Sequence, residues 1–182
     1  MLSADATLTM PVSAHDHIQG NTHAVVTLVE YGDFQCPACG MAYPVVKQIQ
    51  HRYTGNLRLV FRHFPLSQAH PYARMAAELA EAAAVEGDFW AMHDWLYENQ
   101  EDWAADGAAG LEAGVQALDL DPASIAATLR RPEIDAHIRR DFMGGVRSGV
   151  NGTPSFYVDG HQFQGEFDAL VHGIGRLIAR RA

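Results

Sequence analysis

The chain has 182 residues, which suffices for one domain, or for one domain with a sizeable insertion, around an adequate hydrophobic core. Its 13 Lys and Arg residues against 22 Asp and Glu residues leave a formal charge of -9, which opposes non-specific binding to nucleic acid or to an anionic membrane. No stretch approaches the ~20 apolar residues of a transmembrane helix. Residues 1–16 lack the apolar core, preceded by Lys or Arg, of a secretion signal. These patterns predict a soluble, cytoplasmic protein without nucleic-acid or membrane partners.

The first predicted elements place the only two cysteines of the chain, Cys36 and Cys39, at the start of a helix. Residues 25–31 are short, apolar and β-branched, as in a buried strand, and Gly32-Asp33 ends that strand. From Cys36 to about residue 51 the pattern is helical. Proline is favoured at the first helical position, so Pro37 predicts that Cys36 is the N-cap.

A thiol at a helix N-cap has its thiolate stabilised by unpaired backbone N–H groups and by the helix dipole. We therefore expect Cys36 to titrate below about pH 7.5 and to be the nucleophile of a dithiol redox centre. Cys39 lies one turn further into the helix, so it is expected to be the covered, resolving thiol.

Two other interpretations of the cysteine pair stay open. A structural zinc site needs four ligands, and His17 and His23 are the nearest candidates upstream of the pair. The two cysteines could also be inert core thiols or a purely structural disulfide, since buried cysteine is common. In a reducing cytosol, however, a C-x-x-C pair is better explained by catalysis or sensing.

The rest of the chain predicts a helical region between two pairs of strands. Residues 57–62 alternate like a strand and complete a β-α-β unit. A hairpin is predicted at residues 155–158 and 161–163, before a last helix capped by Asp168. Between them, helix signals begin near Ala69, Asp88, Asp121-Pro122 and Arg131-Pro132.

Residues 30–39 (EYGDFQCPAC) and residues 149–156 (GVNGTPSF) together resemble the DsbA-like branch of the thioredoxin superfamily. The resemblance implies an α/β chain with a thioredoxin-like fold and an inserted all-helical domain. The implied organisation is an N-terminal arm (1–23), a thioredoxin-like domain (24–67 and 149–182) and a helical insertion (68–148). It also implies thiol-disulfide oxidoreduction on protein or small-molecule disulfides or thiols, with a redox partner that the sequence does not identify.

The resemblance makes Thr153-Pro154 a cis-proline loop that faces the cysteines. Substrate would then contact Pro37, Ala38, Thr153 and Pro154, with the Thr153 backbone free to pair with an extended substrate. A trans proline that merely begins an edge strand is the alternative.

Glu30 is the third residue of the implied catalytic set, beside Cys36 and Cys39. It shares a strand face with Val26 and Leu28, so burial should raise its pKa and let it exchange a proton with Cys39. A glutamate that reaches solvent near the end of the strand is the alternative.

Several features carry less weight. Single histidines such as His63, His93 and His137 have no metal-ligand spacing, so no metal and no cofactor is predicted. Aromatic residues of the insertion are expected in the core, or else along a peptide groove. About 24 residues precede the first predicted strand, which is too few for the dimerisation domain of the family's isomerases, so a monomer is expected.

The sequence determines least well whether the protein oxidises or reduces its substrates. Strongly oxidising relatives carry histidine where this chain has Ala38, so we expect a reduction potential nearer about -200 mV than about -120 mV. The alternatives to an enzyme are a non-catalytic redox sensor or adaptor of the same fold and, less favoured, a metal-binding protein.

Overall fold

A sheet at the centre of the molecule positions the cysteine pair. A computed structural model describes residues 2–181, and within them six strands form one mixed sheet in the order β1-β6-β5-β3-β4-β2. The strands are β1 (Leu2–Thr7), β2 (His17–Gly20), β3 (Val26–Gly32), β4 (Leu57–His63), β5 (Ser155–Val158) and β6 (His161–Phe163).

The middle of the sheet has the predicted β-α-β and β-β-α halves. β3 and β4 run parallel, from Val26 opposite Leu57 to Gly32 opposite His63, and α1 (Pro37–Arg52) connects them. β5 lies antiparallel on the other side of β3. Two parallel strands with a crossover helix bring the carboxyl ends of β3 and β4 to the same edge, which is where α1 begins.

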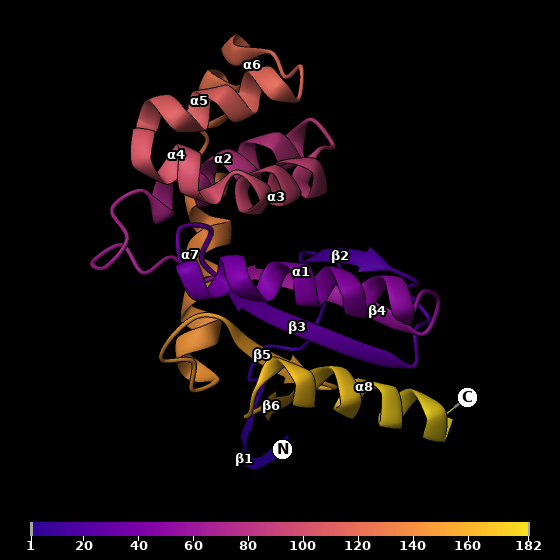
Figure 1. The fold of residues 1–182 in the computed structure, drawn as a ribbon. Helices are drawn as coiled ribbons and strands as arrows, with labels where there is room; N and C mark the ends of the chain where they lie inside the picture. The colour runs from indigo at the N-terminus through magenta and orange to yellow at the C-terminus, as the bar shows by residue number, and fades with distance from the viewer. Residues whose placement is uncertain (1, 182) are drawn as a thin grey trace.

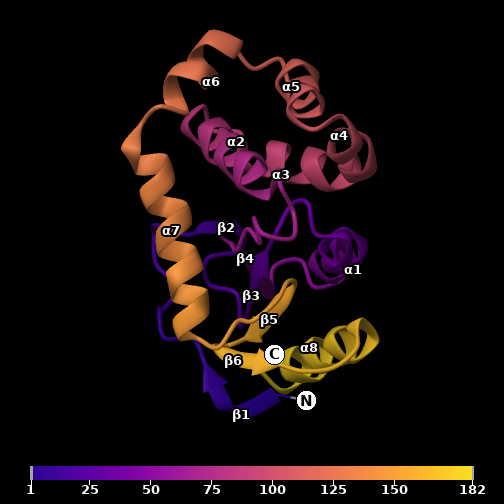
Figure 2. The same ribbon diagram turned by 90° about the vertical axis from the view of Figure 1, so that its left-hand side faces the viewer.

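Helices cover both faces of the sheet. α1 and α8 (Phe167–Arg181) lie on one face and α7 (Pro132–Arg147) lies on the other, as Figure 2 shows. Apolar residues of α1, α8 and the sheet form one core cluster. A second cluster, on the α7 side, includes Tyr31, Phe64 and Tyr157, with Phe142 packed against it. Because both faces of the sheet are covered, the last five residues of β3 and of β4 are all buried.

The remaining helices form a separate layer on the side of the sheet that ends in β4 and β2, next to α1 (Figure 1). They are α2 (Ala73–Val85), α3 (Phe89–Glu98), α4 (Gln100–Asp106), α5 (Ala108–Ala117) and α6 (Pro122–Thr128). Their apolar faces form one cluster that also includes Phe34, Cys36 and Cys39. The predicted helical region therefore covers the cysteine pair, and the aromatic residues Phe89 and Trp103 lie in its core, as expected.

Three details differ from the sequence-based expectations. Residues 2–7 and 17–20 of the N-terminal arm form β1 and β2, which no local pattern predicted. α8 begins at Phe167, so Asp168 lies in its first turn and is not the cap. Asp88 does occupy the N-cap of α3, but its side chain makes no capping hydrogen bond there. No helix within residues 2–181 is long and apolar enough to cross a membrane.

Candidate active site

Cys36 lies at the N-cap of α1, at the carboxyl end of β3. Its backbone is extended, with φ -73° and ψ 120°, and Pro37 takes the first helical position, as predicted. The Cys36 carbonyl accepts the first helical hydrogen bonds, from the N–H groups of Cys39 (3.0 Å) and Gly40 (3.1 Å). The two cysteines are thus one helical turn apart.

The two thiols differ in their access to solvent. Cys39 is 0% exposed, whereas Cys36 retains 6% of its surface. Both are free thiols in this structure. Cys36 is therefore the sulfur that a substrate could reach, and Cys39 lies behind it.

The two thiols also differ in pKa, in opposite directions. The pKa of Cys36 is lowered to about 5, mainly by a hydrogen bond from Cys39, against the opposing effect of burial; a contact with Thr153 and the N–H groups of Ala38 and Cys39 add to the lowering. Burial is the main cause that raises the pKa of Cys39 well above its usual range. At neutral pH the pair is therefore one thiolate and one thiol.

We expect the absorbance at 240 nm to report a Cys36 thiolate with a midpoint near pH 5, because its pKa is about 5. Cys39→Ala removes the hydrogen-bond donor and should raise the midpoint. Cys39→Ser should raise it less, because the serine hydroxyl can donate in place of the thiol. Cys36→Ser should remove the transition. A midpoint near 8.5, the value of an ordinary cysteine, would contradict the N-cap geometry.

The loop before β5 lies against Cys36. The Thr153–Pro154 peptide bond is cis. The Cys36 thiol donates a hydrogen bond to the Thr153 carbonyl oxygen, with an Sγ–O distance of 3.4 Å. This segment, 117 residues downstream of the cysteine, therefore forms one wall of the site. Around the thiols, Pro37 is exposed and Ala38, Thr153 and Pro154 are partly exposed, so all four offer surface to a substrate.

Glu30 is buried beneath the pair. It is 2% exposed, so the alternative of a solvent-facing glutamate is wrong. Its Oε1 atom has no hydrogen-bond partner, and burial raises the pKa of the carboxyl to about 8. The charge of Glu30 in turn helps to raise the pKa of Cys39. The two groups thus influence each other's protonation.

Replacing Glu30 by glutamine should change how stability depends on pH. The Glu30 carboxyl has a pKa of about 8 in the folded protein and 4.5 in the unfolded chain. Its contribution to the free energy of unfolding is therefore complete below pH 4.5 and is lost as the pH rises towards 8. The advantage of Glu30→Gln over the natural protein should therefore grow by ~3 kcal/mol between pH 5 and pH 8. Urea unfolding at both pH values measures this difference, with the exposed Glu112→Gln as the matched control. Parallel pH profiles for the natural protein and Glu30→Gln would contradict it.

Two residues to which the sequence patterns assigned no role in the site hold the cysteine loop. The Gln100 side chain donates to the carbonyl oxygens of Phe34 (2.7 Å) and Cys36 (3.0 Å). Asp33 is buried and accepts from the backbone N–H of Gln35 at 2.8 Å. Gln100 lies 64 residues from Cys36, so no local signal marks it, whereas an aspartate that follows a strand is a recognisable turn former.

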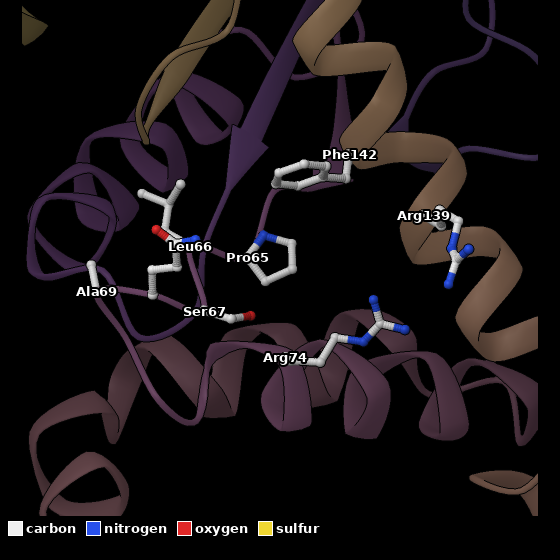
Figure 3. Close-up of a pocket in the computed structure, with 8 residues that line it drawn as sticks. Pro65, Leu66, Ser67, Ala69, Arg74, Arg139 and Phe142 are labelled. Carbon is white, nitrogen blue, oxygen red and sulfur yellow. The ribbon is translucent and has the colours of Figure 1, made fainter.

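Asp33 also links the cysteine loop to the segment after β4. It accepts hydrogen bonds from the Leu66 N–H (2.9 Å) and from His70 Nδ1 (2.7 Å). This segment borders a cavity of about 640 Å³ between α2 and α7. Figure 3 shows Pro65 between Phe142 of α7 and Arg74 of α2. An apolar hollow edged by arginine side chains therefore lies beside the site.

The zinc alternative built on the cysteine pair has no support in the geometry. His17 bonds to Glu81, and His23 is exposed. Within residues 2–181, neither Cys36 nor Cys39 belongs to a group of potential metal ligands.

Comparison with known proteins agrees with this architecture. Residues 13–173 match the thioredoxin family. Na(+)/H(+) antiporters NhaA of Salinispora arenicola and Salinispora tropica are each 42% identical over 162 residues, which is 88% of this chain but 24% of theirs. The chain thus spans about a quarter of the length of these relatives.

Among solved structures, a thioredoxin-like oxidoreductase from Silicibacter pomeroyi has a TM-score of 0.79 and 28% identity over 93% of this chain and 95% of its own. Alpha-DsbA1 of Wolbachia pipientis, at 19% identity, has a TM-score of 0.82 and 95% coverage of both chains. These likenesses confirm the predicted thioredoxin-like fold with its helical insertion. The chain therefore belongs to the thioredoxin family.

Proposed function

We propose that the chain is a thiol-disulfide oxidoreductase whose redox centre is the Cys36–Cys39 pair. The observation that carries the proposal is the difference between the two thiols. Cys36 has a pKa of about 5 and keeps 6% of its surface exposed, whereas Cys39 has a raised pKa and is 0% exposed. Disulfide exchange needs one thiolate to attack and one thiol held in reserve. An inert core pair would need no such division.

Reduction of a substrate would follow two exchange steps. The Cys36 thiolate attacks one substrate sulfur, which forms a mixed disulfide and releases the other substrate sulfur as a thiolate. Cys39 then loses its proton and attacks the Cys36 sulfur, so that the second substrate sulfur leaves and a Cys36–Cys39 disulfide forms. Two electrons pass to the substrate. The reverse sequence oxidises a substrate dithiol.

Glu30 would accept the proton of Cys39 in the second step. Its pKa of about 8 lies near the working pH, which is where a general base is most effective. Oε1 of Glu30 has no hydrogen-bond partner among the described residues, so this atom is free to take a proton. Glu30→Gln should then slow the release of a mixed disulfide more than its formation.

Substrates would bind across Pro37, Ala38, Thr153 and Pro154 as extended segments that carry a disulfide or a thiol. An extended peptide gains main-chain hydrogen bonds along an exposed backbone, and its side chains then occupy flanking hollows. The cavity beside Pro65 and a second hollow lined by Pro37, Met41 and Gln100 could take such side chains. The antiporter names describe proteins of which this chain spans 24%, so ion transport is not part of the proposal.

Turnover tests the proposal against a non-catalytic redox sensor. Insulin reduction with dithiothreitol should be faster in the presence of the protein than with dithiothreitol alone. The Cys36→Ser/Cys39→Ser double variant should return the rate to that of dithiothreitol. A rate equal to this background for the natural protein, although the Cys36–Cys39 disulfide forms reversibly, would favour the sensor and overturn the enzyme.

A further inference from the structure

A cluster of imidazoles surrounds one carboxylate away from the cysteine pair. His17 of β2 and His63 of β4 each place Nε2 near Glu81 Oε1 of α2, at 2.5 Å and 2.7 Å. His137 of α7 places Nδ1 3.3 Å from Glu81 Oε2. The arm, the sheet and two helices thus meet at Glu81.

The cluster is largely shielded from water and still has an edge at the surface. Glu81 and His63 side chains are 6% and 1% exposed, whereas those of His17 and His137 are 15% and 19% exposed. The His17 ring stacks on Phe89 with a centroid distance of 3.4 Å and lies 5.0 Å from the ring of His137. An ion could therefore reach the cluster between His17 and His137.

Three of these residues offer ligand atoms that converge. One nitrogen each of His17 and His137 and one oxygen of Glu81 all lie within 4.8 Å of one another. The set is thus two imidazoles and a carboxylate, which suits zinc and its neighbours in the first transition row.

Neighbouring groups orient these ligands. Asp141 Oδ2 lies 3.5 Å from His137 Nε2, on the side of the ring away from Glu81, and also accepts the backbone N–H of His63 (3.2 Å). A carboxylate behind a histidine ligand fixes the tautomer that leaves the other nitrogen free for metal. The one nearby cation, among the contacts described, is Arg140, which lies 3.5 Å from His137 Nε2 and is paired with Asp141 at 2.9 Å.

We propose that His17, Glu81 and His137 bind a divalent transition-metal ion such as zinc, with His63 and Asp141 as positioning residues. The ion would replace the hydrogen bonds inside the cluster and keep an open position for water. It would fasten β2 of the N-terminal arm to α2 and α7. The individual histidines have no metal-ligand spacing in the sequence, because 64 residues separate His17 from Glu81.

Cobalt binding tests the site without interference from the thiols. In the Cys36→Ser/Cys39→Ser background, stripped of metal with a chelator, we expect one Co²⁺ per chain, with visible d–d absorption and no thiolate charge-transfer band. Zn²⁺ should displace it. The absence of stoichiometric Co²⁺ and Zn²⁺ binding would overturn the proposal.

Variants locate the ion. His17→Gln and His137→Gln should weaken Zn²⁺ binding by about 100-fold or more, and Asp141→Asn by about 10- to 100-fold. His172→Gln on α8, whose side chain is exposed, should leave binding unchanged and is the matched control. Unchanged affinity in His17→Gln and His137→Gln would overturn the site.

A measurement on the unaltered cluster covers the case in which those variants fail to fold. In NMR spectra of the Cys36→Ser/Cys39→Ser protein, Zn²⁺ should shift the ring nitrogens of His17 and His137, and Co²⁺ should broaden them. The rings of the exposed His23 and His51 should not change. Shifts confined to exposed histidines would mean that the metal binds elsewhere.

Discussion

Cys36→Ser is expected to abolish thiol-disulfide turnover, because it removes the only thiolate that a substrate can reach. Cys39→Ser should have a different outcome: Cys36 still attacks, but the mixed disulfide has no internal thiol to resolve it. Covalent adducts with substrate should then accumulate. Non-reducing electrophoresis and mass spectrometry of the trapped species measure both results.

The double variant Cys36→Ser/Cys39→Ser is the control for adducts that form elsewhere, since the chain has no other cysteine. It should trap nothing. Recovery of covalent partners with Cys36→Ser but not with Cys39→Ser would reverse the two roles, and with them the interpretation of the split pKa values.

Arg62→Met is expected to destabilise the protein by about 3 to 5 kcal/mol, because it breaks a buried ion pair from one side only. Arg62 is 0% exposed and lies 2.8 Å from Asp16, which the change would leave buried with Arg140 as its remaining cation. Three further hydrogen bonds, to the carbonyls of Met10 and Pro11 and to the Tyr31 hydroxyl, would also be lost. Urea unfolding measures the free-energy difference.

Arg58→Met, on the same strand β4, is the matched control. Arg58 is partly exposed and bonds to the Thr27 hydroxyl and the Thr22 carbonyl, so its loss should cost about 1 kcal/mol. Equal destabilisation by the two changes would show that the arm is not held by Arg62.

The sequence predicts a helix or strand, and the place where it begins, when residues close together in the chain determine that structure. The apolar, β-branched residues of β3 and the proline at the start of α1 placed Cys36 at a helix N-cap without knowledge of the fold. Asp121 is a further example, because its side chain accepts from the N–H groups of Ala123 and Ser124, as its position before a proline suggests.

Long-range contacts are what local patterns could not supply. β2 has few apolar residues and forms because His17 to Gly20 pair with Phe61 to Arg58 of β4. Arg62 looked like the polar position of an alternating strand, yet the arm covers it completely. Gln100 and the histidines around Glu81 come together for the same reason, since partners from distant segments complete their hydrogen bonds.

The reduction potential of the Cys36–Cys39 pair tests most directly the claim that it is an exchangeable redox centre. Equilibration with glutathione buffers should show a reversible two-electron transition between about -270 and -120 mV, the range from thioredoxin to DsbA. With Ala38 before the second cysteine, we expect a value nearer about -200 mV. A pair that forms no disulfide, or a potential below about -300 mV as in structural disulfides, would contradict the account.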